Sequence, residues 1–133
     1  MDARVATVGT NGILQRLSSK SLALIAPHQH KVKLTQGLVL HKSGEAISSV
    51  YFPISGMVSI LAVLKSGEAI EAGVIGREGF VGGFMGVRGW RSLGQAVVQM
   101  SGEAMRLNVR HFKKAYGMPP GQWNGLVVED AAR

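Results

Sequence analysis

Two arginines flank a tryptophan in the middle of the chain, inside a glycine-rich segment that spans residues 76–94. Arg88 and Arg91 could together hold an anion, and Trp90 between them could stack on a planar ring. The alternative is a solvated loop in which Trp90 covers the mouth of the fold. Nineteen residues without clear periodicity in a small domain usually either carry function or contain an unrecognised element. The segment is therefore the first place to expect a ligand.

A second charged group stands at the start of the same segment, where Arg77 and Glu78 precede Gly79. The simplest interpretation is a turn in which Arg77 and Glu78 form a local ion pair, which would contribute only ~0–1 kcal/mol. The alternative is a ligand-binding role for one of the two side chains. The sequence leaves both interpretations open.

His28 and His30 form a His-x-His fragment that is also found in metal-binding jelly rolls of the cupin type. Such a site needs a Glu a few residues later and a third His in the next motif. Glu45 is too far along the chain, and no histidine lies in the block of residues 53–56. The sequence therefore does not favour a metal site. His111, near the end of the chain, is expected to face solvent.

No constellation of side chains typical of an enzyme is visible. Glu68 and Glu71 lie three residues apart on an expected strand, so they point to opposite faces and do not form a general acid–base pair. There is no Gly-x-Ser-x-Gly elbow. The absence of Cys excludes disulfides, thiolate metal sites and a cysteine nucleophile. We therefore expect a protein without enzymatic activity and without a metal or other cofactor.

Composition indicates one small, soluble domain. The 133 residues include 15 Lys and Arg against 8 Asp and Glu, a net charge of +7, and 46% are hydrophobic. This is enough for a real core, and the 18 Gly are about twice the ~7% average share, which favours a turn-rich β protein. No signal peptide and no apolar run of ~18 residues is visible. We expect a cytoplasmic protein without a membrane partner, whose charge allows only nonspecific contact with nucleic acid.

Short helices are predicted at both ends of the chain. Asn11 and either Ser18 or Ser19 are suited to cap two N-terminal helices. Asn108 is suited to cap a C-terminal helix, which carries Val109, Phe112 and Tyr116 on one face.

Between these helices, the pattern indicates short antiparallel strands. After residue 30 the period changes to two, and Leu38 and Leu40 alternate with the residues that follow them, so the two leucines are expected on one face. The strongest hairpin joins residues 57–64 to 69–75. Gly56 and Gly67 are expected in turns that need a positive φ. We predict a mainly β fold, an antiparallel jelly-roll-like barrel with short flanking helices.

Two blocks in the middle of the chain carry a family resemblance. Residues 50–59 are Val-Tyr-Phe-Pro-Ile-Ser-Gly-Met-Val-Ser, and residues 75–82 are Ile-Gly-Arg-Glu-Gly-Phe-Val-Gly. In this order and spacing they resemble the sensory module of the Crp/Fnr superfamily of bacterial transcription regulators, a cyclic-nucleotide-binding-type β-roll. The resemblance covers about residues 11–116, nearly the whole chain.

The resemblance implies a ligand pocket around the glycine-rich segment. In nucleotide-binding members, backbone N–H groups after a glycine hold the cyclic phosphate. A Glu that follows a Gly binds the ribose hydroxyl, and an Arg followed by a small hydroxyl residue neutralises the phosphate. Here the Glu position falls on Gly83, and the Arg position falls near Ser92, with Arg91 beside it. The resemblance therefore implies a degenerate pocket that binds cyclic AMP and cyclic GMP weakly or not at all, with these candidate residues: Arg77, Glu78, Gly79, Val81, Gly82, Gly83, Arg91 and Ser92.

Three segments are expected: a flexible arm at 1–10, the β-roll at 11–117 and an irregular tail at 118–133. Family regulators continue into a long dimerisation helix and a helix-turn-helix, which do not fit into the seventeen residues after position 116. No sequence-specific DNA binding by this chain alone is therefore expected.

The expected partners are a small-molecule effector and, weakly, a second copy of the chain. The copy would bind through the helix at 108–116 and the apolar residues 126–128, because apolar surface near Phe112 would be left open. The sequence thus favours a regulatory sensor domain without enzymatic activity. The alternative from another class is a small cupin-like jelly roll that binds a metal or a sugar.

Overall fold

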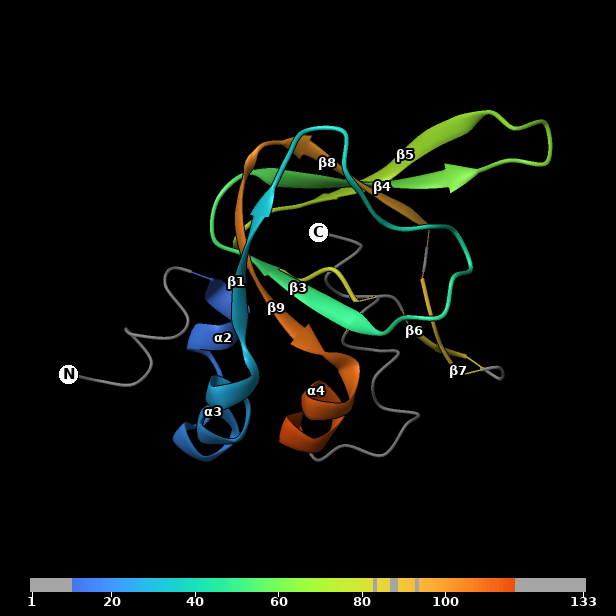
Figure 1. The fold of residues 1–133 in the computed structure, drawn as a ribbon. Coiled ribbons are helices and arrows are strands. Elements are labelled where there is room, and N and C mark those ends of the chain that lie inside the picture. Colours follow the sequence, from blue (N-terminus) through green and yellow to red (C-terminus); the bar gives the residue numbers. More distant parts are fainter. Residues whose placement is uncertain (1–10, 83, 87–88, 93, 117–133) are drawn as a thin grey trace.

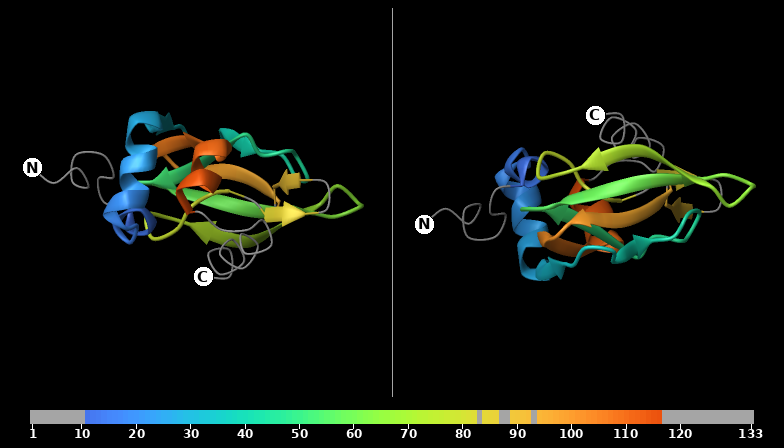
Figure 2. Two further views of the ribbon diagram at one scale, coloured as in Figure 1. Left: turned by 90° about the horizontal axis from the view of Figure 1, so that it is seen from below. Right: turned by 90° about the horizontal axis from the view of Figure 1, so that it is seen from above.

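A computed structural model of the chain describes residues 11–82, 84–86, 89–92 and 94–116. Short helices gather at one end of the β-sheets, and a long hairpin projects from the opposite end (Figures 1 and 2). The expected arm at 1–10 and tail at 118–133 lie outside the described residues. In chain order, the elements are α2 (Gly12–Gln15), α3 (Ser19–Ile25), η1 (Ala26–His28), β1 (His30–Leu34), β2 (Val39–His41), β3 (Ser49–Pro53), β4 (Met57–Val63), β5 (Ala69–Ile75), β6 (Phe84–Gly86), β7 (Gly89–Arg91), β8 (Gln95–Met100), β9 (Gly102–Asn108) and α4 (Val109–Tyr116).

The described strands form three antiparallel sheets. One sheet has the order β1-β9-β3, the second has the order β2-β8-β4-β5, and the third is the ribbon β6-β7. Strands β8 and β9 are separated only by Ser101 but pair in different sheets, so the chain crosses from one sheet to the other at this residue. The predicted mainly β, jelly-roll-like fold with few short helices is confirmed. The described strands make separate sheets and not one closed barrel.

Helix capping follows the sequence closely. The side chain of Asn11 accepts hydrogen bonds from the N–H groups of Ile13 and Leu14, and Ser18 accepts one from Ser21. At the other end, the side chain of Asn108 accepts a hydrogen bond of 2.9 Å from the N–H of Arg110. These bonds satisfy N–H groups that have no partner inside the helix.

The glycine-rich segment contains two short strands, β6 and β7, that its sequence pattern does not indicate. Strand β6 pairs with β7, with Phe84 opposite Arg91 and Gly86 opposite Gly89. Three-residue strands that include glycines are too short to show an alternating hydrophobic pattern. The nineteen residues are therefore not one loop.

Strand β2 corrects the expectation for Leu38 and Leu40. Leu38 is exposed and Leu40 is only partly buried, whereas His41 is buried. The register between β2 and β8 shifts between Val39 and His41. An irregularity of this kind breaks the two-residue alternation, so His41 turns into the core.

The helical end of the molecule is packed around three aromatic rings. Phe52, Phe80 and Phe112 are all nearly or fully buried, and their ring centroids lie 5.2–5.9 Å apart. Burial of each ring contributes ~1.5–3 kcal/mol. The ring of Phe112 itself therefore offers no exposed surface, because it fills the core under α4, and the expected self-association stays a prediction. Of the expected self-association surface, residues 126–128 lie outside the described residues.

The two predicted turn glycines are confirmed and give a matched test of the fold. Gly56 has a φ of 81° and Gly67 a φ of 89°. A Cβ at Gly56 would lie 2.5 Å from the carbonyl oxygen of Met100, whereas a Cβ at Gly67 would meet nothing within 4 Å. We predict that Gly67→Ala lowers the free energy of unfolding by about 1 kcal/mol through backbone strain alone. Gly56→Ala should lower it at least twice as much, by about 2–4 kcal/mol, because a steric clash is added.

Urea denaturation of both variants measures the difference. Equal losses for Gly56→Ala and Gly67→Ala would show that the approach between Gly56 and the β8–β9 connection is not as close as described.

Candidate functional site

A fully buried asparagine connects the glycine-rich segment to the helical end. Asn11 has no exposed surface, and its Nδ2 donates to the carbonyl oxygens of Pro53 at 2.7 Å and Gly79 at 3.0 Å. Its Oδ1 accepts from the N–H groups of Ile13 and Leu14 at 3.0 and 3.1 Å. Every hydrogen-bonding group of this side chain is thus used. Asn11 joins the start of α2, the end of β3 and the turn at residues 76–79.

The turn itself presents Arg77 and Glu78 to solvent. The N–H of Gly12 donates to the carbonyl oxygen of Arg77 at 2.6 Å. Within the turn, the N–H of Gly79 donates to the carbonyl oxygen of Gly76 at 3.2 Å. The structure shows the turn, but within the described residues Arg77 and Glu78 do not form the local ion pair considered above. Together with Gly12 and Gln15, the two residues line an open cavity of about 380 Å³.

Directly after the turn, the chain enters the core. Val81 is 2% exposed and exchanges two hydrogen bonds with Tyr51 of β3, at 2.8 and 3.0 Å. Gly82 follows in a place without room for a side chain, since a Cβ there would collide with the ring of Phe80 and lie 3.1 Å from Val50. Close packing alone is therefore enough to require a glycine at 82.

Ser92 is held at another point of the fold. It is 5% exposed, its N–H donates to the carbonyl oxygen of Glu45 at 2.9 Å, and its hydroxyl donates to the carbonyl oxygen of Gly94. Arg91 is the last residue of β7, and its backbone pairs with Phe84. Gly83 lies outside the described residues.

The predicted site residues thus fall into separate groups. Arg77 and Glu78 line a cavity together with residues of α2. Val81 and Gly82 pack against residues of β3. Ser92 is buried and hydrogen-bonded to Glu45 and Gly94. These are three places in the described part of the fold, and the candidate pocket as a whole, which includes Gly83 and the side chain of Arg91, stays a prediction.

One buried titratable residue was missed by the sequence analysis. His41 is 4% exposed, its ring packs 5.6 Å from that of Tyr51, and its Nε2 lies 3.0 Å from the carbonyl oxygen of Ser49. Because a carbonyl only accepts, Nε2 carries the proton, which leaves Nδ1 buried and without a partner in the described part of the chain. Burial lowers the pKa of His41 below its ordinary value of 6.5, against the smaller raising effects of the Ser49 carbonyl and Glu45. A histidine in a run of alternating apolar residues gives no signal of this in the sequence.

Comparison with known families decides the affiliation. Residues 31–117, well over half of the chain, match the family "Cyclic nucleotide-binding domain". The chain belongs to this family. No curated protein matches the sequence.

Solved structures show the same fold at low sequence identity. A mutant regulatory subunit of a cAMP-independent protein kinase A from Trypanosoma brucei, bound to cAMP in its A site, has a TM-score of 0.72 and 18% identity over 86% of this chain and 43% of its own. The sensor domain of the transcriptional regulator DNR from Pseudomonas aeruginosa has a TM-score of 0.65 and 17% identity over 89% of this chain and 79% of its own.

A third similar structure is a cyclic nucleotide-binding-like protein from Brucella abortus, with a TM-score of 0.62 and 19% identity over 88% of this chain and 100% of its own. The chain spans less than half of the length of the Trypanosoma subunit. At these identities, the likeness establishes the fold of this cyclic nucleotide-binding domain.

None of the described helices is long and apolar enough to cross a membrane. Within the described ranges, no group of three His, Cys, Asp or Glu side chains is placed to hold a metal ion.

The buried His41 makes the stability of the domain depend on pH. The pKa of His41 is lower in the folded state than the 6.5 of the unfolded state, so between these two values the unfolded chain binds more protons. The free energy of unfolding should therefore decrease as the pH falls below about 6.5 and level off below the folded pKa. Urea denaturation between neutral pH and pH 5 should show this slope.

Two variants identify the group responsible. His41→Gln should reduce the slope, whereas His30→Gln, which changes an exposed residue, should leave it in place. Some slope should remain in His41→Gln, because the pKa of His111 is also lowered. A slope that is the same in His41→Gln as in the wild type would contradict the account.

Proposed function

We propose that this chain is the sensor domain of a Crp/Fnr-type transcription regulator and that its pocket responds to an effector other than cyclic AMP or cyclic GMP. The family assignment and the fold support a regulatory domain that binds a small molecule. They favour it over the cupin-like alternative, for which the described residues offer no metal ligand set. A cytoplasmic location and a non-enzymatic role belong to the same proposal.

The altered specificity rests on one observation: the polar groups that would bind the ribose and the phosphate are missing or engaged elsewhere at the positions where the resemblance expects them. The ribose-binding carboxylate would stand at position 83, which is a glycine. The hydroxyl of Ser92, at the expected phosphate end, is buried and donates to the carbonyl oxygen of Gly94. A charge-assisted hydrogen bond contributes ~1.5–3 kcal/mol, so losing two of them removes most of the affinity for a cyclic nucleotide.

The rings at the helical end provide a route from the pocket to α4. Phe80 belongs to the segment that follows the Arg77–Glu78 turn, and its ring centroid lies 5.2 Å from that of Phe112 on α4. A ligand that displaced residues 79–82 would therefore press on this helix. Helix α4 is also linked to α3, because the hydroxyl of Ser21 donates to the carbonyl oxygen of Ala115 at 2.9 Å. In the proposed function, these helices carry the output.

Calorimetry tests the specificity. Cyclic AMP and cyclic GMP should give no measurable heat of binding to the wild-type chain. Gly83→Glu should bring the binding of cyclic AMP into the measurable range, because it supplies the missing carboxylate. Thr35→Glu, which adds the same charge at an exposed position outside the segment, should change nothing. Micromolar affinity of the wild-type chain for either nucleotide would overturn the proposed specificity.

A further inference from the structure

A second pocket lies at the helical end, and none of its lining residues belongs to the glycine-rich segment. Its volume is about 250 Å³, and it opens where β1, β3 and β9 meet η1 and α4. The strand register places His30 opposite Arg106 and Ser49 opposite Asn108. Polar side chains dominate its lining: His28, His30, Ser49, Arg106, Asn108 and His111.

Two histidines of this pocket are stacked on each other. The ring centroids of His28 and His111 are 3.7 Å apart, and the ring planes are within 3° of parallel. His111 is partly exposed, and its ring also covers that of His28, a contact that the sequence did not indicate. A metal ion binds in the plane of an imidazole ring, and two parallel planes 3.7 Å apart do not share one ion. The stack thus offers N–H donors and no metal site.

The pocket has donors but no carboxylate among its lining residues. Arg106 forms no ion pair within the described chain, and its guanidinium carries five N–H donors. The Oδ1 of Asn108 is already used by the N–H of Arg110, which leaves its Nδ2 as a donor. The hydroxyl of Ser49 is a further donor.

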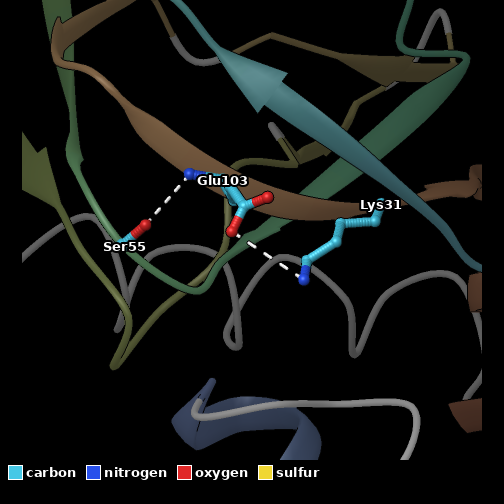
Figure 3. Close-up of polar contacts among 3 residues, drawn as sticks. All are labelled: Lys31, Ser55 and Glu103. Carbon is cyan, nitrogen blue, oxygen red and sulfur yellow. Dashed lines mark hydrogen bonds and ion pairs between the residues drawn. The ribbon is translucent and has the colours of Figure 1, made fainter.

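The nearest acid on β9 is turned away from the pocket. Glu103 lies three residues before Arg106, so its side chain points to the opposite face of the strand. There it lies 3.8 Å from the ammonium group of Lys31, and its N–H donates to the hydroxyl of Ser55 at 3.1 Å (Figure 3). The pocket therefore keeps an uncompensated positive charge.

We propose that this pocket binds a small oxyanion of the phosphate class. The guanidinium of Arg106 provides two parallel donors, which match two oxygens of such an anion. The imidazoles, the amide of Asn108 and the hydroxyl of Ser49 bind the remaining oxygens. This site is independent of the effector pocket proposed above.

Protonation of His111 should strengthen the site. The groups around the stack are His28 on η1, His30 on β1, Arg106 on β9, and Arg110, His111 and Lys114 on α4. Burial lowers the pKa of His111, and the positive charges of His28, Arg110 and Lys114 lower it further. A bound anion reverses this repulsion, so binding takes up protons and the affinity should increase as the pH falls.

Titration followed by NMR of the histidine side chains tests the proposal. Sodium sulfate is the first probe, because it stays a dianion throughout the pH range, and sodium chloride of equal ionic strength is the control. The signals of His28 and His111 should shift and saturate with sulfate, while that of the buried His41 should not. The affinity should rise as the pH falls.

Variants of two exposed arginines locate the site. Arg106→Gln should weaken sulfate binding about tenfold or more, through the loss of one charge-assisted contact. Arg16→Gln, at the end of α2, should leave it unchanged. His111→Phe, which keeps a stacked ring but removes its N–H groups, should also weaken binding and abolish part of its pH dependence. A shift that does not saturate, or equal losses in Arg106→Gln and Arg16→Gln, would overturn the proposal.

A second pair of probes identifies the source of the phosphate. Inorganic phosphate and glycerol phosphate are compared at one pH. Equal affinities indicate a free ion, and tighter binding of glycerol phosphate indicates an organic phosphate. If neither one shifts His28 and His111 when sulfate does, the phosphate class is wrong.

Discussion

The position of the turn at residues 76–79 depends on one buried side chain. Asn11 caps α2 with its oxygen and holds the carbonyl oxygens of Pro53 and Gly79 with its nitrogen. Three parts of the chain that are far apart in sequence thus meet at one amide group. A hydrocarbon side chain there would leave two carbonyl oxygens and two N–H groups buried without partners, each at a cost of ~1–3 kcal/mol. The turn at 76–79 can be exposed and polar because its base is anchored in this way.

From this anchor, the chain runs without a break into the aromatic core. The turn with Arg77 and Glu78 is followed by Phe80, which contacts Phe52 and Phe112, and by Val81, which is bonded to Tyr51. Residues 79–82 therefore belong to the core. In the proposed function, a ligand bound beside this segment would act directly on the packing under α4.

Much of this architecture could be predicted from the sequence, where local chemistry decides the structure. Asn11 and Ser18 cap helices because their side chains reach nearby N–H groups. The β4–β5 hairpin follows from two apolar runs around a glycine turn. The family blocks at 50–59 and 75–82 indicated the fold that the family match and the solved structures establish.

Features that depend on long-range contacts could not be predicted in this way. The bonds from Asn11 to Pro53 and Gly79 span 42 and 68 residues. The burial of His41 follows from a register shift against β8, and the stack of His28 on His111 brings η1 and α4 together. Nor does the sequence reveal that Ser92 is engaged with Gly94. Each of these requires the tertiary fold before the side chain acquires its environment.

The most direct test of this account compares two helix-capping residues. Asn11→Ala removes a buried side chain that joins three segments, whereas Ser18→Ala removes an exposed cap that serves α3 alone. Urea denaturation of each variant, together with amide hydrogen exchange at Gly79 and Val81, measures both the stability and the anchoring. The account predicts a loss of at least ~3 kcal/mol and faster exchange at both amides for Asn11→Ala, against about 1 kcal/mol and unchanged exchange for Ser18→Ala. Equal losses in the two variants, with Gly79 and Val81 still protected, would contradict it.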